Sequence, residues 1–550
     1  MSILENSMAS EVAGPVDQTT RNRKHTLGNV RLRDKDTNAL ILIPTPSRDP
    51  NDPLNWPQWR KYYTAGLVCL AMTMSNFLSG GPSIAIVSTA LDFFPDAAAN
   101  GTLVSSAIPK VAYFFTTTSL LMGVGCFFWV PMTNKFGRRP VYLASYLLYF
   151  AVALWLIFDK SYAGFLTGRI LMGFGAGAAE TIAPISIADI FFLHERGAIM
   201  SFYNCALSVG VALGMVISGL ITIDHGWRTI YLVSAVLVGF VLVLIFLTFP
   251  ETSYHRQQKG RDGSIISITL QDDKDSTSRS CNEELGQLSA IPQKKTMRET
   301  LAVWNGCLTS ESLLKLFIRP FLLIALPPVL WAALVQSVTI GFLVAVSSNI
   351  GAAFETAYGF EAYQSGLCFV AAIIGSLLGI PAGGHLGDKV ADYLTKRNGG
   401  IREPEMRLPV IVLAMITTPL ALVLYGVGIQ HQLHWIVPTI GLGLLNFSIT
   451  QAASVSLVYV IDSYRPVAGE VSLAVLGFKS MFGFLLSFYT NPWINVSGYQ
   501  NAFGAMAGIA AAVLVCWIPL YVWGKHIRHV TWHWPLVSYV YWDDDREVGE

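Results

Sequence analysis

Charged residues are scarce in this sequence. Asp, Glu, Lys and Arg make up 13% of its 550 residues, whereas soluble domains carry about 25%. Hydrophobic residues reach 53%, and the mean hydropathy is +0.48. The net charge of +1, with its basic residues in loops, gives no sign of a nucleic-acid partner. This composition predicts a polytopic membrane protein.

Cysteine patterns of a disulfide framework or a metal site are also missing. The seven cysteines form no CxxC pair, and Cys126, Cys205, Cys368 and Cys516 lie inside apolar runs, where they are expected to pack. Residues 1–60 contain no apolar h-region, so no cleavable signal peptide is expected there.

A short basic loop, VPMTNKFGRRP at 130–140, separates two long apolar runs. It carries Lys135, Arg138 and Arg139. Loops rich in Lys and Arg next to membrane spans stay in the cytoplasm, so this loop sets the predicted orientation of the whole chain.

About 20 apolar residues cross a bilayer. The sequence offers two sets of six such runs, at 62–82, 105–129, 140–158, 162–188, 198–222, 229–249, and at 320–345, 363–384, 408–429, 433–460, 469–490, 501–523. We therefore expect an all-α membrane protein with twelve transmembrane helices in two pseudo-symmetric six-helix bundles. The loops after the second and eighth spans align as VPMTNKFG and GHLGDKVA. Such a repeat is typical of transporters whose halves rock about a central site.

This count divides the chain into five parts. They are a cytoplasmic tail predicted to be disordered (1–60), a first bundle (61–250), a cytoplasmic linker (251–318), a second bundle (319–524) and a cytoplasmic C-terminal tail (525–550). The end of the linker, 312–320, is a predicted in-plane helix. The sequons at Asn100 and Asn495 fall outside the cell on this count and are predicted glycosylation sites.

Polar residues are distributed unevenly among the spans. Spans 3, 6, 9 and 12 are almost free of them and are expected to face lipid, whereas the other eight are expected to form a cavity. The candidate substrate contacts in those eight spans are Asn76, Lys110, Gln336, Asn446, Gln451 and Lys479. The alternative for each is a bond from helix to helix.

The fourth span places an acid and a base on one helix face. Arg169 and Glu180 are eleven residues apart, about 1100° of rotation and ~16 Å of rise, which returns to within about 20° of the same face. Pro184 cannot donate to the carbonyl of Glu180 and invites a kink there. A buried carboxylate can take up a proton near neutral pH, so Glu180 is the candidate coupling group. Lys110 or Lys479 is its candidate partner, and the sequence does not distinguish them. A purely structural role for Arg169 and Glu180 is the alternative.

Several motifs together resemble the major facilitator superfamily, and more narrowly the twelve-span fungal drug:proton antiporters. They are DPLNW (52–56), FGRRP (136–140), FLTGRILMGFGAGAAE (165–180), HERG (194–197), GWR (226–228) and PET (250–252). The resemblance covers roughly residues 50–525 and implies a part in proton coupling for Arg169. Asn134 stands where the family's loop has an aspartate, and the fifth span reads GVALGMVISGL, without the antiporters' Gly-Pro.

The cytoplasmic loops supply a predicted gate. Its members are Asn134, Lys135, Gly137, Arg138, Arg139, Asp189, Arg196, Asp388, Asp462 and Arg465. For the charges at the span ends, a solvated loop position is the alternative.

These features lead to one expected function and two alternatives. We expect a proton-coupled efflux transporter of small organic molecules, acting by alternating access, with no cofactor beyond the proton gradient. It is expected to be a monomer in the bilayer, in the plasma membrane or alternatively the vacuolar membrane, with protons and a small-molecule substrate as its partners. The alternatives are a proton-coupled importer of polyamines or other organic cations, and a nutrient sensor that does not transport. HERGA (194–198) fails the HExxH pattern and no acidic pair lies at matched depth, so an enzyme is not expected.

Overall fold

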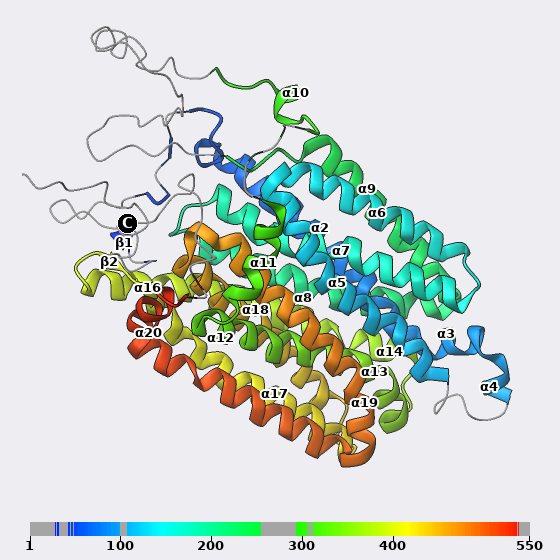
Figure 1. Ribbon diagram of the computed structural model, residues 1–550. Coiled ribbons are helices and arrows are strands. Elements are labelled where there is room, and N and C mark those ends of the chain that lie inside the picture. The colour runs from blue at the N-terminus through cyan, green and yellow to red at the C-terminus, as the bar shows by residue number, and fades with distance from the viewer. Residues whose placement is uncertain are drawn as a thin grey trace, which may run out of the picture.

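The computed structural model describes residues 28, 30–31, 42–44, 46–47, 49–99, 107–254, 293–304, 306, 308, 312–535 and 537. Nearly all of these lie in long apolar helices, which Figure 1 shows running side by side through the body of the molecule. Asn100 and most of the predicted linker lie outside the described residues.

The first half contains six membrane-length helical stretches. After a short 3-10 turn, η1 (Pro53–Asn55), they are α2 (Gln58–Gly80) continued by η2 (Gly81–Ala85) and α3 (Ile86–Phe93), then, beyond the short α4 (Pro95–Ala99), α5 (Ile108–Phe136), α6 (Arg138–Phe158), α7 (Tyr162–Ile190), α8 (Arg196–Asp224) and α9 (Arg228–Thr248).

Two short helices precede the second half. These are α10 (Met297–Thr300) and α11 (Leu313–Leu323). On α11, Leu316 and Leu323 are buried, while Leu314 and Phe321 are exposed. Exposed apolar side chains on one face are typical of a helix lying in the membrane interface, as predicted for 312–320.

The second half is built from more interrupted helices. They are α12 (Pro327–Gln336) joined through a π-helical turn, η4 (Ser337–Gly341), to α13 (Phe342–Tyr358); α14 (Ala362–Leu367), α15 (Val370–Ile380), η5 (Pro381–His385) and α16 (Leu386–Arg397); η6 (Pro404–Ile411) and α17 (Val412–Gln430); α18 (Ile436–Ser463); and η7 (Arg465–Val467), α19 (Ala468–Val515) and α20 (Trp517–Trp532).

Eleven helical stretches of the described chain are long and apolar enough to cross a membrane, and the last, Arg465–Trp532, is 68 residues long. It is interrupted at Gly498, where φ is 76° and ψ is 164°. A residue other than glycine would be strained at that φ. The chain turns back there, at the lower right of Figure 1. Splitting the stretch at Gly498 gives the twelve crossings that the sequence predicts.

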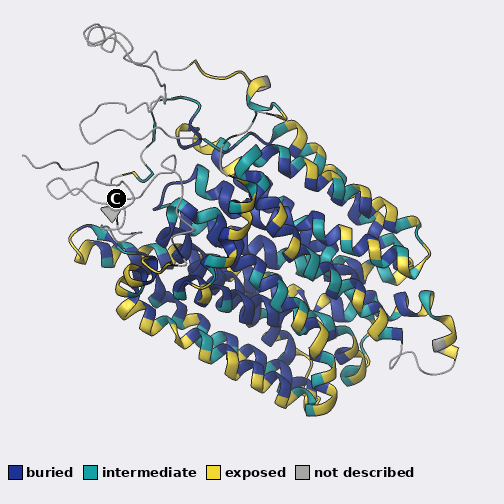
Figure 2. Ribbon diagram, viewed as in Figure 1, coloured by how far each residue is buried: buried dark blue, intermediate teal, exposed yellow. Residues whose placement is uncertain are grey.

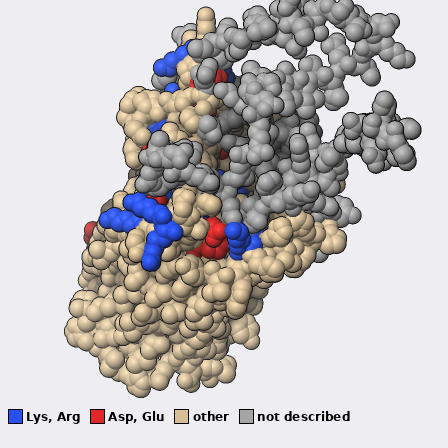
Figure 3. Space-filling view, turned by 90° about the vertical axis from the view of Figure 1, so that its left-hand side faces the viewer, with Lys and Arg blue, Asp and Glu red and all other residues tan. Residues whose placement is uncertain are grey.

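Burial separates inner from outer helices. In α7 and α18, 83% and 89% of the most apolar window is buried, against 39% in α9. Figure 2 shows the exposed residues along the outer edges formed by α6 and α9 and by α17 and α20. Figure 3 shows charged side chains in the upper part of its face and none over the lower body. The low burial of α9 agrees with a lipid-facing sixth span, whereas Arg138–Phe158 and Pro404–Gln430, each 44% buried, are no more exposed than the predicted cavity-forming stretch Ala362–Arg397 at 44%.

A short strand joins the N-terminal tail to the second half. β1 (Val30–Arg31) pairs antiparallel with β2 (Ile401–Arg402), in the loop after α16. Gly28, with φ of +87°, lies against the backbone of Asp462. The prediction of a disordered tail is therefore wrong for these residues, because backbone pairing with β2 holds them in place.

Candidate functional site

A cavity of about 110 Å³ lies between the two halves. The first half contributes residues of α2, η2, α5, α7 and α8, and the second half contributes residues of η4, α13 and α19. Its lining is rich in hydroxyl groups, from Ser79, Ser83, Ser119, Ser347, Ser348, Ser480 and Ser487. Phe115 is the one aromatic side chain among the described lining residues.

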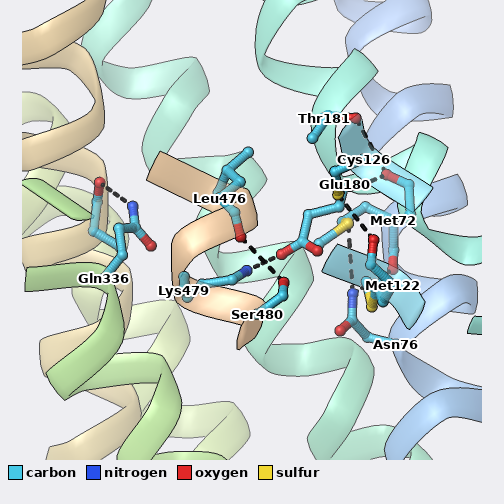
Figure 4. A network of polar contacts seen from close by, with 12 residues as sticks. Met72, Asn76, Met122, Cys126, Glu180, Thr181, Gln336, Leu476, Lys479 and Ser480 are labelled. Atoms are coloured by element: carbon cyan, nitrogen blue, oxygen red, sulfur yellow. Dashed lines mark hydrogen bonds and ion pairs between the residues drawn. The ribbon is translucent and has the colours of Figure 1, made fainter. Parts of the chain in front are cut away.

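The cavity wall holds one carboxylate and one ammonium group. Glu180 of α7 and Lys479 of α19 form an ion pair through Oε1 and Nζ (Figure 4). Both side chains are at least 95% buried. The second oxygen, Oε2, is buried without a hydrogen-bond partner. The pair therefore joins the first half to the second and leaves one acceptor free at the cavity.

The backbone carbonyl that Pro184 leaves unpaired has found a donor. The hydroxyl of Tyr203, on α8, donates to the main-chain carbonyl oxygen of Glu180 at 2.7 Å. The tyrosine thus fixes α7 at the level of the ion pair. The sequence predicts the free carbonyl but not the residue that satisfies it.

Arg169 holds a break in the first span. Its guanidinium donates to the carbonyls of Leu78 at 3.1 Å, Ser79 at 2.9 Å and Phe114 at 3.0 Å. Pro82 lacks the N–H that would bond to Leu78 in a continuous helix, so Arg169 caps the orphaned carbonyl. This geometry favours a positioning role for Arg169, because Ser79 and Ser83 on either side of the break line the cavity.

Asn76 and Lys479 are the predicted substrate contacts that line the cavity. The amide of Asn76 donates to the carbonyl of Met72 at 3.1 Å. Lys479, not Lys110, is the partner of Glu180.

The other four predicted contacts are not among the residues that line this cavity. Lys110 is exposed at the start of α5, with Nζ 5.1 Å from the centre of the Phe94 ring. The amide groups of Gln336, Gln451 and Asn446 donate to the carbonyls of Ala453, Val410 and Leu442. The backbone thus takes up the N–H groups of these amides, which their polarity in the sequence does not reveal, whereas Oε1 of Gln336 and of Gln451 is buried without a hydrogen-bond partner.

The predicted gate loop folds around an acid that was not predicted. Both oxygens of Glu251 accept backbone N–H groups, of Arg138 at 2.9 Å and of Arg139 at 3.1 Å. The guanidinium of Arg139 donates to the carbonyls at the end of α9, including Phe246 at 2.7 Å. Gly137, with φ of +97°, leaves no room for a Cβ beside Glu251. The PET motif therefore anchors the loop that opens α6.

Further ion pairs link the ends of the helices on the side of the predicted gate loops. Nε of Arg138 lies 3.3 Å from Oδ2 of Asp189, and Nη1 of Arg196 lies 3.5 Å from Oδ1 of Asp462 in the second half. Asp388 pairs with Arg407 at 2.8 Å. A Cβ on Gly197 would collide with both Asp388 and Arg407, so the two halves are in close contact there.

Asn134, which stands where the family's loop has an aspartate, lies beside the start of α19. Asn134 Oδ1 accepts from Arg138 at 3.2 Å and lies beside Gly469, at the start of that helix. The next residue, Glu470, forms a buried ion pair with Arg319 at 2.9 Å. Of the remaining gate residues, Lys135 accepts from the N–H of Leu308 through its carbonyl, and Arg465 begins the turn η7.

Asn495, one of the two predicted glycosylation sites, is exposed but lies in the helix that ends at Gly498 and not in a loop.

A family model described as Major Facilitator Superfamily matches residues 64–474. The chain belongs to the major facilitator superfamily. The twelve crossings in two halves and the cavity between them are the fold of this superfamily, and the chain is a transporter and not an enzyme. It is also a multi-pass membrane protein.

Curated members of the superfamily resemble the chain over most of its length. An uncharacterised transporter of Schizosaccharomyces pombe is 27% identical, covering 90% of this chain and 89% of its own. Protein HOL1 of Saccharomyces cerevisiae is 25% identical, over 92% and 93%. The efflux pump radE of Floropilus chiversii is 24% identical, over 94% and 90%.

Solved structures of the superfamily agree in fold. The human organic anion transporter MFSD10 matches with a TM-score of 0.52 at 15% identity, covering 84% of this chain and 100% of its own. The proton:xylose symporter XylE matches with a TM-score of 0.53 at 17% identity, over 84% and 97%.

Proposed function

We propose that this chain is a proton-coupled secondary transporter that exports small organic molecules by alternating access. The observation that carries the proposal is the buried pair of Glu180 and Lys479, which joins the two halves at the cavity. The proton gradient is the energy source and no cofactor is required. The protein acts as a monomer in the bilayer, and its partners are protons and the substrate.

The pair offers a simple coupling device. Beside Lys479, the ionised form of Glu180 is favoured, and away from it, in a low-dielectric site, the protonated form is favoured. Because the two side chains belong to opposite halves, rocking of the halves separates them. Each cycle then changes the affinity of Glu180 for a proton.

Export is the preferred direction because one of the relatives is named an efflux pump. The plasma membrane is the proposed location, with the vacuolar membrane as the alternative. Proton-coupled uptake of organic cations, such as polyamines, is the second candidate. It is favoured by the partnerless Oε2 of Glu180, an acceptor that suits an ammonium group.

Purified protein in liposomes loaded with a pH-sensitive dye provides the test. Adding solutes from a chemically varied panel should drive proton movement for at least one of them, and Glu180→Gln should abolish that movement. Glu180→Asp is the matched control, since it keeps a titratable carboxylate. Solute binding without flux would instead identify a sensor. Undiminished proton coupling in Glu180→Gln would show that Glu180 is structural. Comparing deletion with overexpression in a toxicity panel then gives the direction, because an exporter raises resistance and an importer raises sensitivity.

A further inference from the structure

The chemistry of the cavity restricts the charge of its substrate. Its described lining has one acid, Glu180, one cation, Lys479, and seven serine hydroxyls. Its volume of about 110 Å³ has room for several waters, or for a solute of several heavy atoms. A single aromatic ring, Phe115, offers little stacking surface to a large planar molecule. A small solute rich in hydrogen-bonding groups fits this wall.

The charge that such a solute carries follows from the ion pair. A simple cation bound to Glu180 displaces Lys479 and leaves the lysine buried beside a second positive charge. A simple anion bound to Lys479 leaves the carboxylate of Glu180 buried beside a second negative charge. An uncompensated buried charge is strongly destabilising. A zwitterion replaces each partner with a group of the same sign and leaves the net charge of the site unchanged.

We propose that the substrate is a small zwitterion that carries an ammonium group and a carboxylate, as an amino acid does. Its ammonium group donates to Glu180, including the partnerless Oε2, and its carboxylate accepts from Nζ of Lys479. The serine hydroxyls bind its remaining polar atoms. This assignment rests on the proposed transport function and names the substrate class of that site.

Insertion of the solute requires the pair to part. Glu180 and Lys479 come from α7 and α19, on opposite halves, so a small separation of the halves opens a gap between them. The four-carbon stem of Lys479 also lets its ammonium group withdraw without movement of the backbone. In Figure 4 both side chains extend toward each other and meet, with Ser480 beside them.

Proton and substrate then compete for one carboxylate. A proton on Glu180 removes the charge that holds the ammonium group, and the zwitterion leaves. Its departure lets Lys479 return once the proton is released to the other side. Mutual exclusion of proton and substrate is the requirement of an antiporter, which agrees with the proposed export.

Binding of matched solutes to the purified, full-length protein tests the proposal without any gradient. The probes are several small amino acids, each in three forms: the free zwitterion, its methyl ester as a cation and its N-acetyl derivative as an anion. The buffer lies about one unit below ~7.7, the pKa of an α-amino group whose carboxyl is blocked, so that the amines of the ester and of the free zwitterion are both charged. Thermal shift in detergent measures apparent Kd.

We expect the parent protein to bind at least one zwitterion about tenfold or more tightly than both its ester and its N-acetyl form, since each lost charge pair removes a strong hydrogen bond. Lys479→Met should reverse the preference toward the ester, and Glu180→Gln toward the N-acetyl form. Glu470→Gln is the matched control. It breaks a different buried ion pair on the same helix α19, with Arg319, and should leave the order of preference unchanged.

Three outcomes overturn the proposal. They are an ester or an N-acetyl form that binds the parent as well as the zwitterion, a Lys479→Met variant that weakens all three forms equally, and a panel in which no zwitterion binds. Proton movement driven by other solutes in the liposome assay would still support proton-coupled transport, so the two proposals fail separately.

Discussion

Removing either partner of the Glu180–Lys479 pair should destabilise the protein far more than removing both. The variants are Glu180→Gln, Lys479→Met and the double variant. Both side chains are at least 95% buried, and neither has a second ionic partner in the part of the chain that the structure describes. Each single change therefore leaves an uncompensated charge between the halves.

The expected magnitude follows from that burial. Breaking a buried ion pair from one side costs about 3–5 kcal/mol, whereas replacing both partners with neutral groups is often close to neutral. We expect each single variant to lose about 3–5 kcal/mol of unfolding free energy and the double variant to lose less than about 1.5 kcal/mol. The coupling energy of the cycle should then exceed ~3 kcal/mol.

Reversible unfolding in mixed micelles of a mild detergent and dodecyl sulfate gives these free energies. The pair of Arg319 and Glu470, equally buried but away from the cavity, is the control cycle. It should show a similar coupling energy without loss of proton coupling in liposomes. Single variants as stable as the parent, or a double variant that loses the sum of the single losses, would refute the reasoning.

Three further predictions concern other parts of the molecule. Arg169→Lys should lower transport about tenfold or more at normal abundance, because lysine lacks the planar fork that caps the carbonyls of the first span. Adding Pro82→Ala, which restores an N–H for the carbonyl of Leu78, should recover part of the lost transport. A double variant that transports no better than Arg169→Lys would contradict the capping role. Asn134→Asp should slow transport about two- to fivefold, because a carboxylate beside Arg138 and the start of α19 stabilises the closed gate by ~0.5–1 kcal/mol. Faster transport by this variant would contradict the stabilising role of the added charge. A tag at 270–290 should react with antibody only after the membrane is permeabilised, and labelling in intact cells would reverse the predicted orientation.

The sequence alone determined the architecture of this protein. The apolar runs fix the number of crossings, because about 20 apolar residues in a helix satisfy their own backbone hydrogen bonds and reach across a bilayer. The concentration of polar residues in eight of the twelve spans predicts which helices are inner and which are outer. The turn at Gly498 falls between the predicted spans 469–490 and 501–523, and the helix α11 begins within the predicted segment 312–320.

The sequence also selected Glu180, since a carboxylate in a membrane span has to face the protein interior. It could not choose between Lys110 and Lys479, because helical periodicity gives the direction of a side chain on its own helix but not the rotation of one helix against another. That rotation places Lys479 against Glu180 and leaves Lys110 exposed.

Only the tertiary structure decided which polar residues are available to a substrate. Gln336, Asn446 and Gln451 resemble cavity residues in the sequence, yet backbone carbonyls of η6 and α18 accept the N–H groups of their amides. In the sequence, Glu251 is only one residue of the PET motif. Its role as the acceptor that anchors the loop before α6 is evident only once α6 and α9 are packed together. A hydrogen bond forms only between groups in direct contact. Which acceptor a side chain finds therefore depends on how distant segments pack, and the local pattern of residues does not show it.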